Sequence, residues 1–228
     1  MSEYYDKTLH YLGRRGVKPS IVVIGAMDGH SFDDMTGYFI TYRWSGLFIE
    51  PIPYQFQALK KFHDSLNYAH SCKYENCAIS EHNGEIEMLT IDIKAIEDGI
   101  IHSCFGGMSA VYPPRNGLGS EGDAPIVAKY GKRIKVPCKT LQTVLDKHKI
   151  TNIDVIQVDT EGWDWKILKQ LDFAIYRPKL IRSEYINLSD EEKEEMIAFF
   201  SDMGYVYTSY AQDIDFVDKY FWKKINGE

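Results

Sequence analysis

The sequence predicts an α/β domain with a mostly parallel β-sheet that is covered by helices on both faces. Short runs of β-branched and apolar residues, typical of buried strands, alternate along the chain with segments of helical spacing. The run Ile21–Ile24 ends at Gly25, and the run Leu47–Ile49 ends at Glu50. Since 228 residues can enclose one substantial core, we expect residues 1–228 to form a single domain.

The first half of the chain alternates helices and strands. An amphipathic segment at residues 3–15 predicts an N-terminal helix within residues 1–18. Phe56, Leu59 and Phe62 recur at helical spacing and predict a second helix. The expected strands are 21–25, 47–49, 74–79 and 85–91, and the expected helices between them are 33–42 and 54–63. A turn at residues 81–84, rich in polar residues and glycine, separates the last two strands.

Residues 92–135 differ in composition from the rest of the chain. Glycine and proline cluster here, as in Gly106-Gly107 and Pro113-Pro114. A structureless segment of this length inside a compact domain is usually a functional loop or disordered. We therefore expect an insert within the domain that acts as a lid or contacts a substrate.

The second half returns to regular alternation. Ser189 followed by acidic residues, with Gly204 after the last apolar turn, predicts a well-capped helix at 189–203. The other expected helices are 140–148 and 163–171, and the expected strands are 153–158, 179–183, 205–210 and 216–221.

Composition excludes several classes of protein. The 26 basic and 33 acidic residues give a formal charge of −7, which argues against nucleic acid as a partner. No segment approaches the roughly 20 apolar residues that cross a bilayer, and no apolar signal sequence follows Met1. We therefore expect a cytoplasmic protein with free thiols. Its four cysteines form no C-x-x-C pair, so zinc is not expected.

The turn after the first strand predicts a nucleoside site. The segment Gly25-Ala26-Met27-Asp28-Gly29 lets the backbone approach a ligand, and Glu50-Pro51 follows the next strand. A carboxylate at that place can accept two hydrogen bonds from a ribose diol. Because neither G-x-G-x-x-G nor a P-loop is present, a cofactor without pyrophosphate is favoured. A simple tight turn and a solvated acid are the alternatives.

Further acids follow later strands. The strand 153–158 ends in Asp159-Thr160-Glu161-Gly162, and Glu184 follows the strand 179–183. Because parallel strands bring their carboxyl ends to one edge, we expect Gly25, Glu50, Asp159 and Glu184 to meet there. Capping of the next helix by Thr160 or Glu161 is the alternative.

These motifs resemble the FkbM-type S-adenosylmethionine-dependent methyltransferases, which have the class I methyltransferase fold. The matching blocks run in order from about residue 20 to 186, and the most specific is Ile153 to Gly162. The others are residues 24–29, 48–53, 77–84, 136–141 and 178–184. The resemblance implies a seven-stranded Rossmann-like sheet and methyl transfer from S-adenosyl-L-methionine, with a sugar, glycan precursor or other small metabolite as the acceptor.

Carried over by position, the resemblance also implies roles for single residues. Gly25 and its neighbours would hold the methionine part of the cofactor, Glu50 the ribose, Asn76 and Cys77 the adenine, and Asp159 would lie beside the sulfonium and the acceptor. Val23 stands where many members carry an acid, so Asp28 is expected to meet the amino end of the cofactor. Trp163 and Trp165 replace smaller residues and are expected to pack against the sheet rather than stack on a substrate.

O-Methylation requires a group that removes the proton of the acceptor. The candidates are Asp159, Glu161, His30 after the glycine turn and His102 in the insert. Ser109, also in the insert, and Glu184 are expected to face the acceptor. Magnesium held by Asp159, Glu161 and Glu184 is a less favoured use of these acids, and we expect no metal.

Two other functions remain open at this point. One is a noncatalytic nucleoside-binding or scaffold protein with a methyltransferase fold. The other, a nicotinamide-dependent oxidoreductase, would need the pyrophosphate site that the sequence lacks. The oligomeric state cannot be derived from the sequence.

Overall fold

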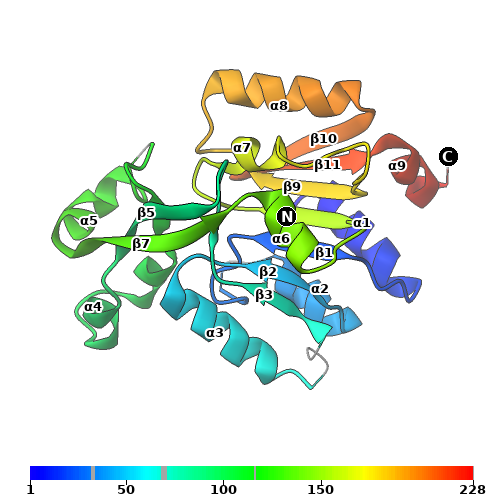
Figure 1. The fold of residues 1–228 in the computed structure, drawn as a ribbon. Helices are drawn as coiled ribbons and strands as arrows, with labels where there is room; N and C mark the ends of the chain where they lie inside the picture. Colours follow the sequence, from blue (N-terminus) through cyan, green and yellow to red (C-terminus); the bar gives the residue numbers. More distant parts are fainter. Residues whose placement is uncertain (32–33, 68–70, 116, 228) are drawn as a thin grey trace.

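A seven-stranded sheet forms the centre of the computed structural model, which describes residues 1–31, 34–67, 71–115 and 117–227 (Figure 1). Its spatial order is β10-β11-β9-β8-β1-β2-β3, and all strands are parallel except β11. The strands are β1 Ile21–Ile24, β2 Gly46–Ile49, β3 Lys73–Glu75, β8 Val155–Val158, β9 Leu180–Glu184, β10 Tyr205–Tyr210 and β11 Asp213–Asp218. The predicted mostly parallel sheet is thereby confirmed.

Strand β1 lies at the point where the strand order reverses. β2 pairs with one of its edges and β8 with the other, both in parallel register. In open α/β sheets, ligands bind outside the carboxyl ends of the strands at such a point. The order therefore places Gly25, Glu50 and Asp159 beside one another at one edge of the sheet.

Alternate residues of the central strands bury their side chains on opposite faces. Val22 and Ile24 belong to one apolar cluster, and Ile21 and Val23 to the other. The first face is covered by α6 Leu141–Lys147, α7 Asp164–Leu168 and α8 Asp190–Asp202, and the second by α1 Glu3–Arg14, α2 Met35–Tyr42 and α3 Pro53–Asp64. Both predicted helical layers are present, with ends that differ by at most three residues from those expected. The expected start of α2 at Asp33 lies outside the described residues.

The expected loop at 92–135 is instead part of a second sheet, of order β4-β7-β5-β6. Its strands are β4 Ala78–Ile79, β5 Gly84–Ile91, β6 Ser109–Val111 and β7 Gly131–Lys139, and short helices α4 Ile93–Glu97, η2 Ser103–Gly107, η3 Glu121–Asp123 and α5 Ala124–Tyr130 lie between them. β7 escaped prediction because Lys and Arg alternate with only three apolar residues, and Pro137 interrupts the pattern. The pairing that orders this strand comes from β5, whose residues lie 40 to 54 positions earlier along the chain, from Ile91 with Gly131 to Gly84 with Cys138.

Two strand predictions near these sheets were wrong in detail. The expected strand 74–79 is divided, because β3 joins the large sheet and β4 the small one. The expected strand 216–221 ends at Asp218, whose carboxylate accepts the backbone N–H groups of Tyr220 and Phe221. This cap starts helix α9 Lys219–Asn226, which the alternating pattern concealed.

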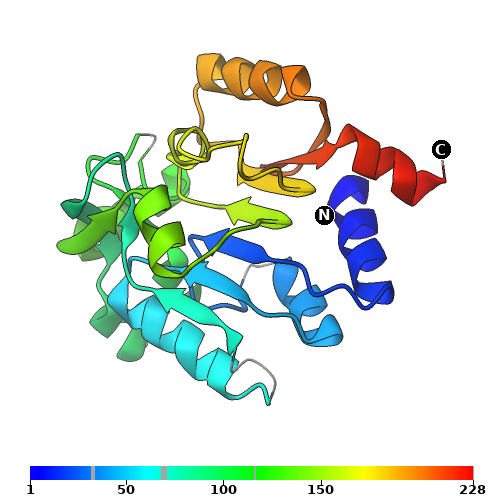
Figure 2. The ribbon, with the colours of Figure 1, turned by 45° about the vertical axis from the view of Figure 1, so that its right-hand side comes forward.

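The two terminal helices lie side by side (Figure 2). The ring of Tyr4 in α1 packs on Trp222 in α9, and Lys7 donates to the side chain of Asn226. Ser2 caps α1 and also donates to Asp215 Oδ2 at 2.5 Å, so the N-terminal helix is fixed to β11. Ser189 caps α8 as predicted, and Glu192 completes a capping box with it.

A buried carboxylate fastens the edge of the large sheet to the small one. Glu75, at the end of β3, lies 2.6 Å from Lys139 Nζ, 2.7 Å from Lys147 Nζ and 2.8 Å from His148 Nε2. Burial by itself would raise the pKa of Glu75, but the contacts with these three partners lower it to about 2. Glu75 therefore stays ionised and binds β3, β7 and α6 together.

Replacing Glu75 by glutamine is expected to reduce the free energy of unfolding by about 2 kcal/mol at pH 7, because the buried carboxylate no longer pairs with Lys139 and Lys147. Since the pKa of Glu75 is lowered in the folded state, its contribution exists above pH 4.5 and is lost as pH falls towards 2. Urea denaturation from pH 7 down to pH 3 should show the difference between the two proteins shrinking. A difference that stayed constant with pH would contradict this role.

Candidate active site

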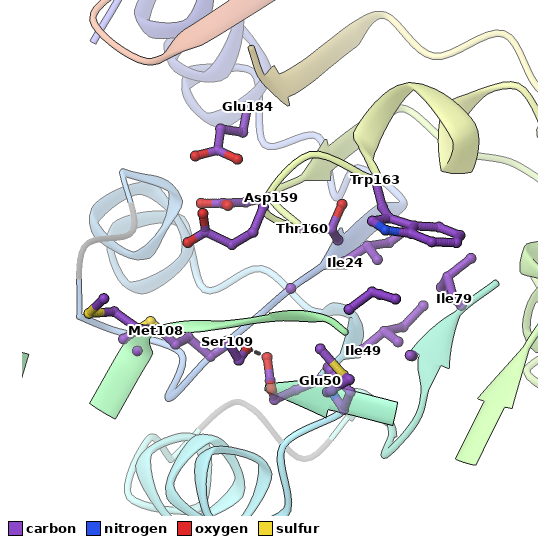
Figure 3. A pocket seen from close by; sticks show the side chains of 18 of the residues that line it. Ile24, Ile49, Glu50, Ile79, Met108, Ser109, Asp159, Thr160, Trp163 and Glu184 are labelled. Carbon is purple, nitrogen blue, oxygen red and sulfur yellow. Dashed lines mark hydrogen bonds between the residues drawn. The ribbon is translucent and has the colours of Figure 1, made fainter. Parts of the chain in front are cut away.

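A cavity of about 550 Å³ opens between the carboxyl ends of the parallel strands and the small sheet (Figure 3). Gly25, Glu50 and Asp159 contribute to its wall from the large sheet, and Met108 and Ser109 contribute from the insert. The other lining residues are Ile24, Met27, Ile49, Pro51, Cys77, Ala78, Ile79, Met88, Cys104, Gly107, Val111, Gly119, Asp123, Thr160, Glu161, Trp163, Ile167, Glu184, Gln212 and Asp213.

Gly25 has a structural reason to be glycine in addition to the predicted one. It has a φ of +80°, and a Cβ at this position would lie 1.7 Å from the carbonyl oxygen of Asp159. The backbone N–H groups of Gly25 and Ala26 both donate to the carbonyl of Ile49 at 3.0 Å. The turn is therefore fixed against β2 and β8, and Gly25 faces the cavity, whereas Ala26 is buried behind it.

Glu50 is held rigidly at the wall of the cavity. Its side chain is buried, and its two carboxylate oxygens accept the backbone N–H groups of Met27 and Ile52, each at 2.8 Å. Burial raises the pKa of Glu50 to about 7, and the charge of Asp28 adds to this, although the two backbone donors act in the opposite direction. One carboxylate thus connects the turns that follow β1 and β2.

Asn76 supports this turn from behind. Its side-chain amide donates to the carbonyls of Glu50 at 2.8 Å and Pro51 at 3.1 Å, and it is not among the lining residues. Its neighbour Cys77 does line the cavity, and burial raises the pKa of its thiol to about 12. Direct contact of Asn76 with the adenine stays a prediction, whereas Pro51 and Cys77 lie on the wall where the sequence placed them.

Three acids meet at the opposite wall, as their positions after strands β8 and β9 predicted. Oxygen atoms of Asp159, Glu161 and Glu184 all lie within 4.8 Å of one another, a spacing that a divalent cation could bridge. The side-chain amide of Asn187 donates to Glu161 at 2.8 Å and to both oxygens of Glu184 at 3.1 Å. Sequence analysis missed Asn187, which follows Glu184 by three residues without a recognisable motif.

A fourth acid, Asp164, anchors the turn that carries these groups. It is fully buried and accepts the hydroxyl of Thr160 at 2.9 Å and the backbone N–H of Glu184 at 3.1 Å. The alternative of helix capping by Thr160 or Glu161 is wrong, because the N-cap of α7 is Trp163, whose side chain makes no capping hydrogen bond. Burial raises the pKa of Asp164 to about 7.

The proximity of these acids changes their proton affinity. Burial, followed by the charges of Asp159, Glu161 and Asp164, raises the pKa of Glu184 to about 10. Burial also raises the pKa of Glu161, although the hydrogen bond from Asn187 opposes the shift. At neutral pH, Glu184 is therefore protonated and can donate a hydrogen bond.

Two other predicted residues lie outside this cavity on the side of the glycine turn. Asp28 accepts the Ser31 hydroxyl at 2.6 Å and the backbone N–H groups of Ser31 and His30 at 2.8 and 3.1 Å. Burial raises the pKa of Asp28, but these hydrogen bonds outweigh burial, and the pKa lies below its usual value. The half-exposed ring of His30 stacks on Phe62.

Gly29 closes the same turn. It has a φ of +79°, and an added Cβ would lie 2.5 Å from Leu59 Cδ1, so the turn requires glycine here.

A smaller cavity of about 350 Å³ adjoins the first one. Asp28 and His102 line it, and it shares Met27, Cys104 and Gly107 with the larger cavity. The Nδ1 atom of His102 accepts the backbone N–H of Cys104 at 3.2 Å and so caps η2. The proposed roles of Asp28 and His102 towards cofactor and acceptor therefore depend on a ligand that reaches this second space, and they stay predictions.

The two tryptophans have different environments. Trp165 is buried and packs on Phe200, with its indole N–H donating to Glu195 at 2.7 Å, as expected for a packing residue. Trp163 instead lies on the cavity wall opposite Ile79 (Figure 3). Trp163 also packs against the apolar cluster below α6, α7 and α8, so the expected packing is present together with a place on the cavity wall. Sequence analysis also missed Gln212 and Asp213, which follow β10 and line the cavity.

The parallel order of the strands and the position of the cavity define a class I methyltransferase fold. The Methyltransferase FkbM domain matches residues 24–207, and the chain belongs to this family. FkbM methyltransferases use S-adenosylmethionine, which is therefore the cofactor. No helix in the described part of the chain combines the length and apolar character needed to cross a bilayer.

Solved structures show the same fold at low sequence identity. Methyltransferase FkbM from Methylobacillus flagellatus has a TM-score of 0.54 at 12% identity, over 88% of this chain and 43% of that protein. This chain thus spans less than half of that protein. The METTL16 methyltransferase domain has a TM-score of 0.52 at 10% identity, over 93% of this chain and 66% of that domain. Cofactor-bound Rv0187 from MTB has a TM-score of 0.50 at 9% identity, over 96% and 81%. No curated protein sequence matches significantly.

The lining of the cavity fits this cofactor. Among the described residues, the wall has no Lys, Arg or His side chain, and it carries the carboxyl groups of Glu50, Asp123, Asp159, Glu161, Glu184 and Asp213. S-Adenosylmethionine carries a sulfonium and an ammonium group, which such a wall attracts. The apolar side chains of Ile79, Trp163 and Ile167 offer a surface for a flat base.

Proposed function

We propose that this protein transfers a methyl group to a hydroxyl of a neutral acceptor, namely a sugar, a glycan precursor or another small metabolite. The observation that carries the proposal is the cavity wall, with its carboxyl groups and no basic side chain among the described residues. An anionic acceptor such as a phosphorylated or carboxylated sugar would meet charge repulsion there. A neutral polyol can use carboxyl groups as hydrogen-bond partners.

The side chains have separable roles in this proposal. The bound cofactor supplies a methyl group on a positively charged sulfur. Glu50 accepts hydrogen bonds from the ribose, and Cys77 and Ile79 flank the base. Asp159 lies beside the reacting centre, and protonated Glu184 donates a hydrogen bond that orients the acceptor. As the new carbon–oxygen bond forms and the methyl–sulfur bond breaks, the hydroxyl proton passes to the carboxylate of Glu161.

Glu161 is favoured as the base over the other candidates for two reasons. Burial raises its pKa, which makes its carboxylate a stronger proton acceptor than an exposed one. In contrast, neither His30 nor His102 is among the residues that line the larger cavity. Ser109, in the β6 strand of the insert, faces the same cavity and is expected to contact the acceptor.

A panel of matched acceptors tests the proposal. The protein and labelled S-adenosylmethionine would be incubated with neutral sugars, the corresponding uronic acids and sugar phosphates, and amino sugars, and the products analysed by mass spectrometry. We expect methyl ethers of neutral acceptors and no methylation of the anionic ones. Preferred methylation of an anionic acceptor would overturn the proposal. Cofactor binding without transfer to any acceptor would favour the noncatalytic alternative.

Glu161→Gln is expected to lower kcat by about 100-fold, since general-base catalysis contributes roughly that much or more. Binding of the cofactor, measured by calorimetry, should change little. In the unchanged protein, kcat should rise with pH through the raised pKa of Glu161 and then level off, because the base acts when deprotonated.

His102→Gln serves as the comparison for this variant. It preserves a polar side chain at the edge of the smaller cavity, and we expect less than a threefold change in kcat. A large loss in His102→Gln together with a small loss in Glu161→Gln would assign proton removal to the histidine instead.

A further inference from the structure

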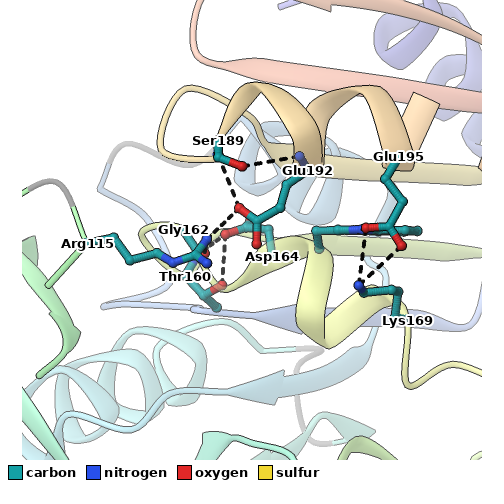
Figure 4. Close-up of polar contacts among 9 residues, drawn as sticks. Arg115, Thr160, Gly162, Asp164, Lys169, Ser189, Glu192 and Glu195 are labelled. Carbon is teal, nitrogen blue, oxygen red and sulfur yellow. Dashed lines mark hydrogen bonds and ion pairs between the residues drawn. The ribbon is translucent and has the colours of Figure 1, made fainter. Parts of the chain in front are cut away.

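One basic side chain of the insert crosses to the opposite side of the cavity. Arg115 follows β6, whose residue Ser109 lines the cavity, and extends towards the turn after β8 and the start of α8 (Figure 4). The insert also touches α3, where the hydroxyl of Tyr54 donates to the carbonyl of Gly106 at 2.5 Å. The insert thus contacts elements that flank the large sheet on both sides of the cavity.

Arg115 makes two polar contacts through a single nitrogen. Its Nη1 atom donates to Glu192 Oε2 at 2.5 Å and to the carbonyl oxygen of Gly162 at 3.3 Å. The stem of the side chain also packs over Gly162, where an added Cβ would lie 3.5 Å from Arg115 Cδ. Arg115 therefore touches both the turn after β8 and the first turn of α8.

The contacted turn is the one that presents the acids of the cavity. Asp159, Thr160 and Glu161 line the cavity, and Gly162 follows them directly. Glu161 has a φ of +54° and Gly162 a φ of +98°, so both adopt left-handed conformations. Such a conformation costs a non-glycine residue energy unless its surroundings hold it. A hydrogen bond to the next carbonyl contributes to holding Glu161 in place.

The partner of Arg115 is itself fixed. Glu192 also accepts the backbone N–H of Ser189 at 3.1 Å as part of the capping box. The Glu192 side chain is 16% exposed and that of Arg115 35%, so water screens this pair only in part. A second ion pair at α8, between Lys169 and Glu195, has exposures of 42% and 55% and does not involve the insert (Figure 4).

We propose that Arg115 is a positioning residue that fixes the insert against the acid-bearing turn, so that the cavity is closed and Glu161 is oriented when cofactor and acceptor are bound. This inference rests on the proposed function for the role of Glu161. The effect of Arg115 on the retention of S-adenosylhomocysteine, the product formed from the cofactor, does not depend on which acceptor is used.

Arg115→Met tests the proposal, because methionine retains an apolar stem and removes both polar contacts. We expect S-adenosylhomocysteine to dissociate about tenfold faster in stopped-flow measurements. We also expect faster hydrogen exchange at the amides of residues 105–111. For an acceptor that the protein methylates, the KM of that acceptor should rise about tenfold. Arg115→Lys, which retains the charge, should bring the dissociation rate, the hydrogen exchange and the KM most of the way back to the values of the natural protein.

Glu192→Gln separates the ion pair from the cap. Glutamine serves in a capping box, so the helix should remain capped while Arg115 loses its ionic partner. Its effect on dissociation should be no larger than that of Arg115→Met, because the contact with the Gly162 carbonyl remains, and the double variant should be no worse than Arg115→Met alone. Lys169→Met is the matched control, with no change expected in dissociation or exchange.

Unchanged product dissociation and unchanged exchange in Arg115→Met would overturn the proposal. Equal effects of Lys169→Met and Arg115→Met would also overturn it, since the loss would then reflect general weakening of α8. If no acceptor is methylated, the proposed function fails, but the dissociation and exchange measurements still decide the role of Arg115.

Discussion

Replacing Glu50 by glutamine is expected to weaken binding of S-adenosylmethionine by about 100-fold. A carboxylate accepts hydrogen bonds at both oxygens, whereas the amide accepts at one only. In the folded protein the two oxygens already accept the N–H groups of Met27 and Ile52. A glutamine must leave one of these donors unpaired or turn its NH₂ group towards it. Loss of one hydrogen bond to the ribose, and of the charge that strengthens the other, costs about 3 kcal/mol, which is about 100-fold in affinity.

The fold should tolerate this change. The pKa of Glu50 is raised to about 7, so the stability that its protonated form provides is lost as pH rises through neutrality. Glutamine removes that buried charge, which offsets the weaker hydrogen bonding to the backbone. Calorimetry should therefore show lost binding, and thermal denaturation should show a shift of only a few degrees.

Asp28→Asn is the informative comparison, because the sequence placed Asp28 in the cofactor site and its side chain lies at the smaller cavity. We expect the affinity for cofactor to fall less than threefold. An equal loss in both variants would mean that the amino end of the cofactor reaches Asp28. Unchanged binding in Glu50→Gln would contradict the assignment of the ribose site.

Glu184→Gln is expected to raise the stability of the protein and to lower its turnover rate. Since the pKa of Glu184 is raised to about 10, its folded state favours the protonated form, and stability is lost as pH rises from about 4.5 towards 10. Glutamine imitates the protonated acid at every pH. At pH 7 we expect a gain of about 2 kcal/mol in the free energy of unfolding, or roughly 5 °C in Tm.

The gain should depend on pH in a defined direction. The gain should be small at pH 5 and grow towards pH 9. Glu75→Gln differs in sign, because it lowers the stability, and its effect is complete above pH 4.5. In Glu184→Gln, turnover should nevertheless fall about tenfold, because the orientation of the acceptor and the electrostatic field at Glu161 both change. Natural active sites often retain groups that destabilise the fold but serve the reaction. A variant less stable than the natural protein at pH 8 would show that Glu184 is ionised and favourably paired.

Much of the site could be predicted because it lies at strand ends. Gly25, Glu50 and Asp159 each follow a short apolar run and Glu184 ends the strand β9, and the rule for parallel sheets brings such positions to one edge. The same reasoning did not predict that Asp28 lines the smaller cavity instead of the larger one, or that His30 lines neither of the two. Their backbone is at the right edge, but local hydrogen bonds with Ser31 turn the Asp28 side chain back onto its own turn.

The second sheet shows a different limit. β5 was predicted from its own pattern, but β7 alternates charged and apolar residues around Pro137 and is stabilised by pairing with β5. Pairing between strands so far apart along the chain leaves no local signal. The same holds for Arg115, whose partners at Gly162 and Glu192 lie 47 and 77 residues further along.

The sequence by itself determined the class of fold, the nucleoside turn, the acids Glu50, Asp159 and Glu184 at strand ends and the resemblance to the FkbM methyltransferases, because hydrophobic period and strand-end chemistry are local properties. The tertiary structure decided which of these side chains share one cavity, which acid retains a proton and which residues hold the insert in place. Those properties depend on burial and on distances between charges, and both arise only when segments remote in sequence pack together.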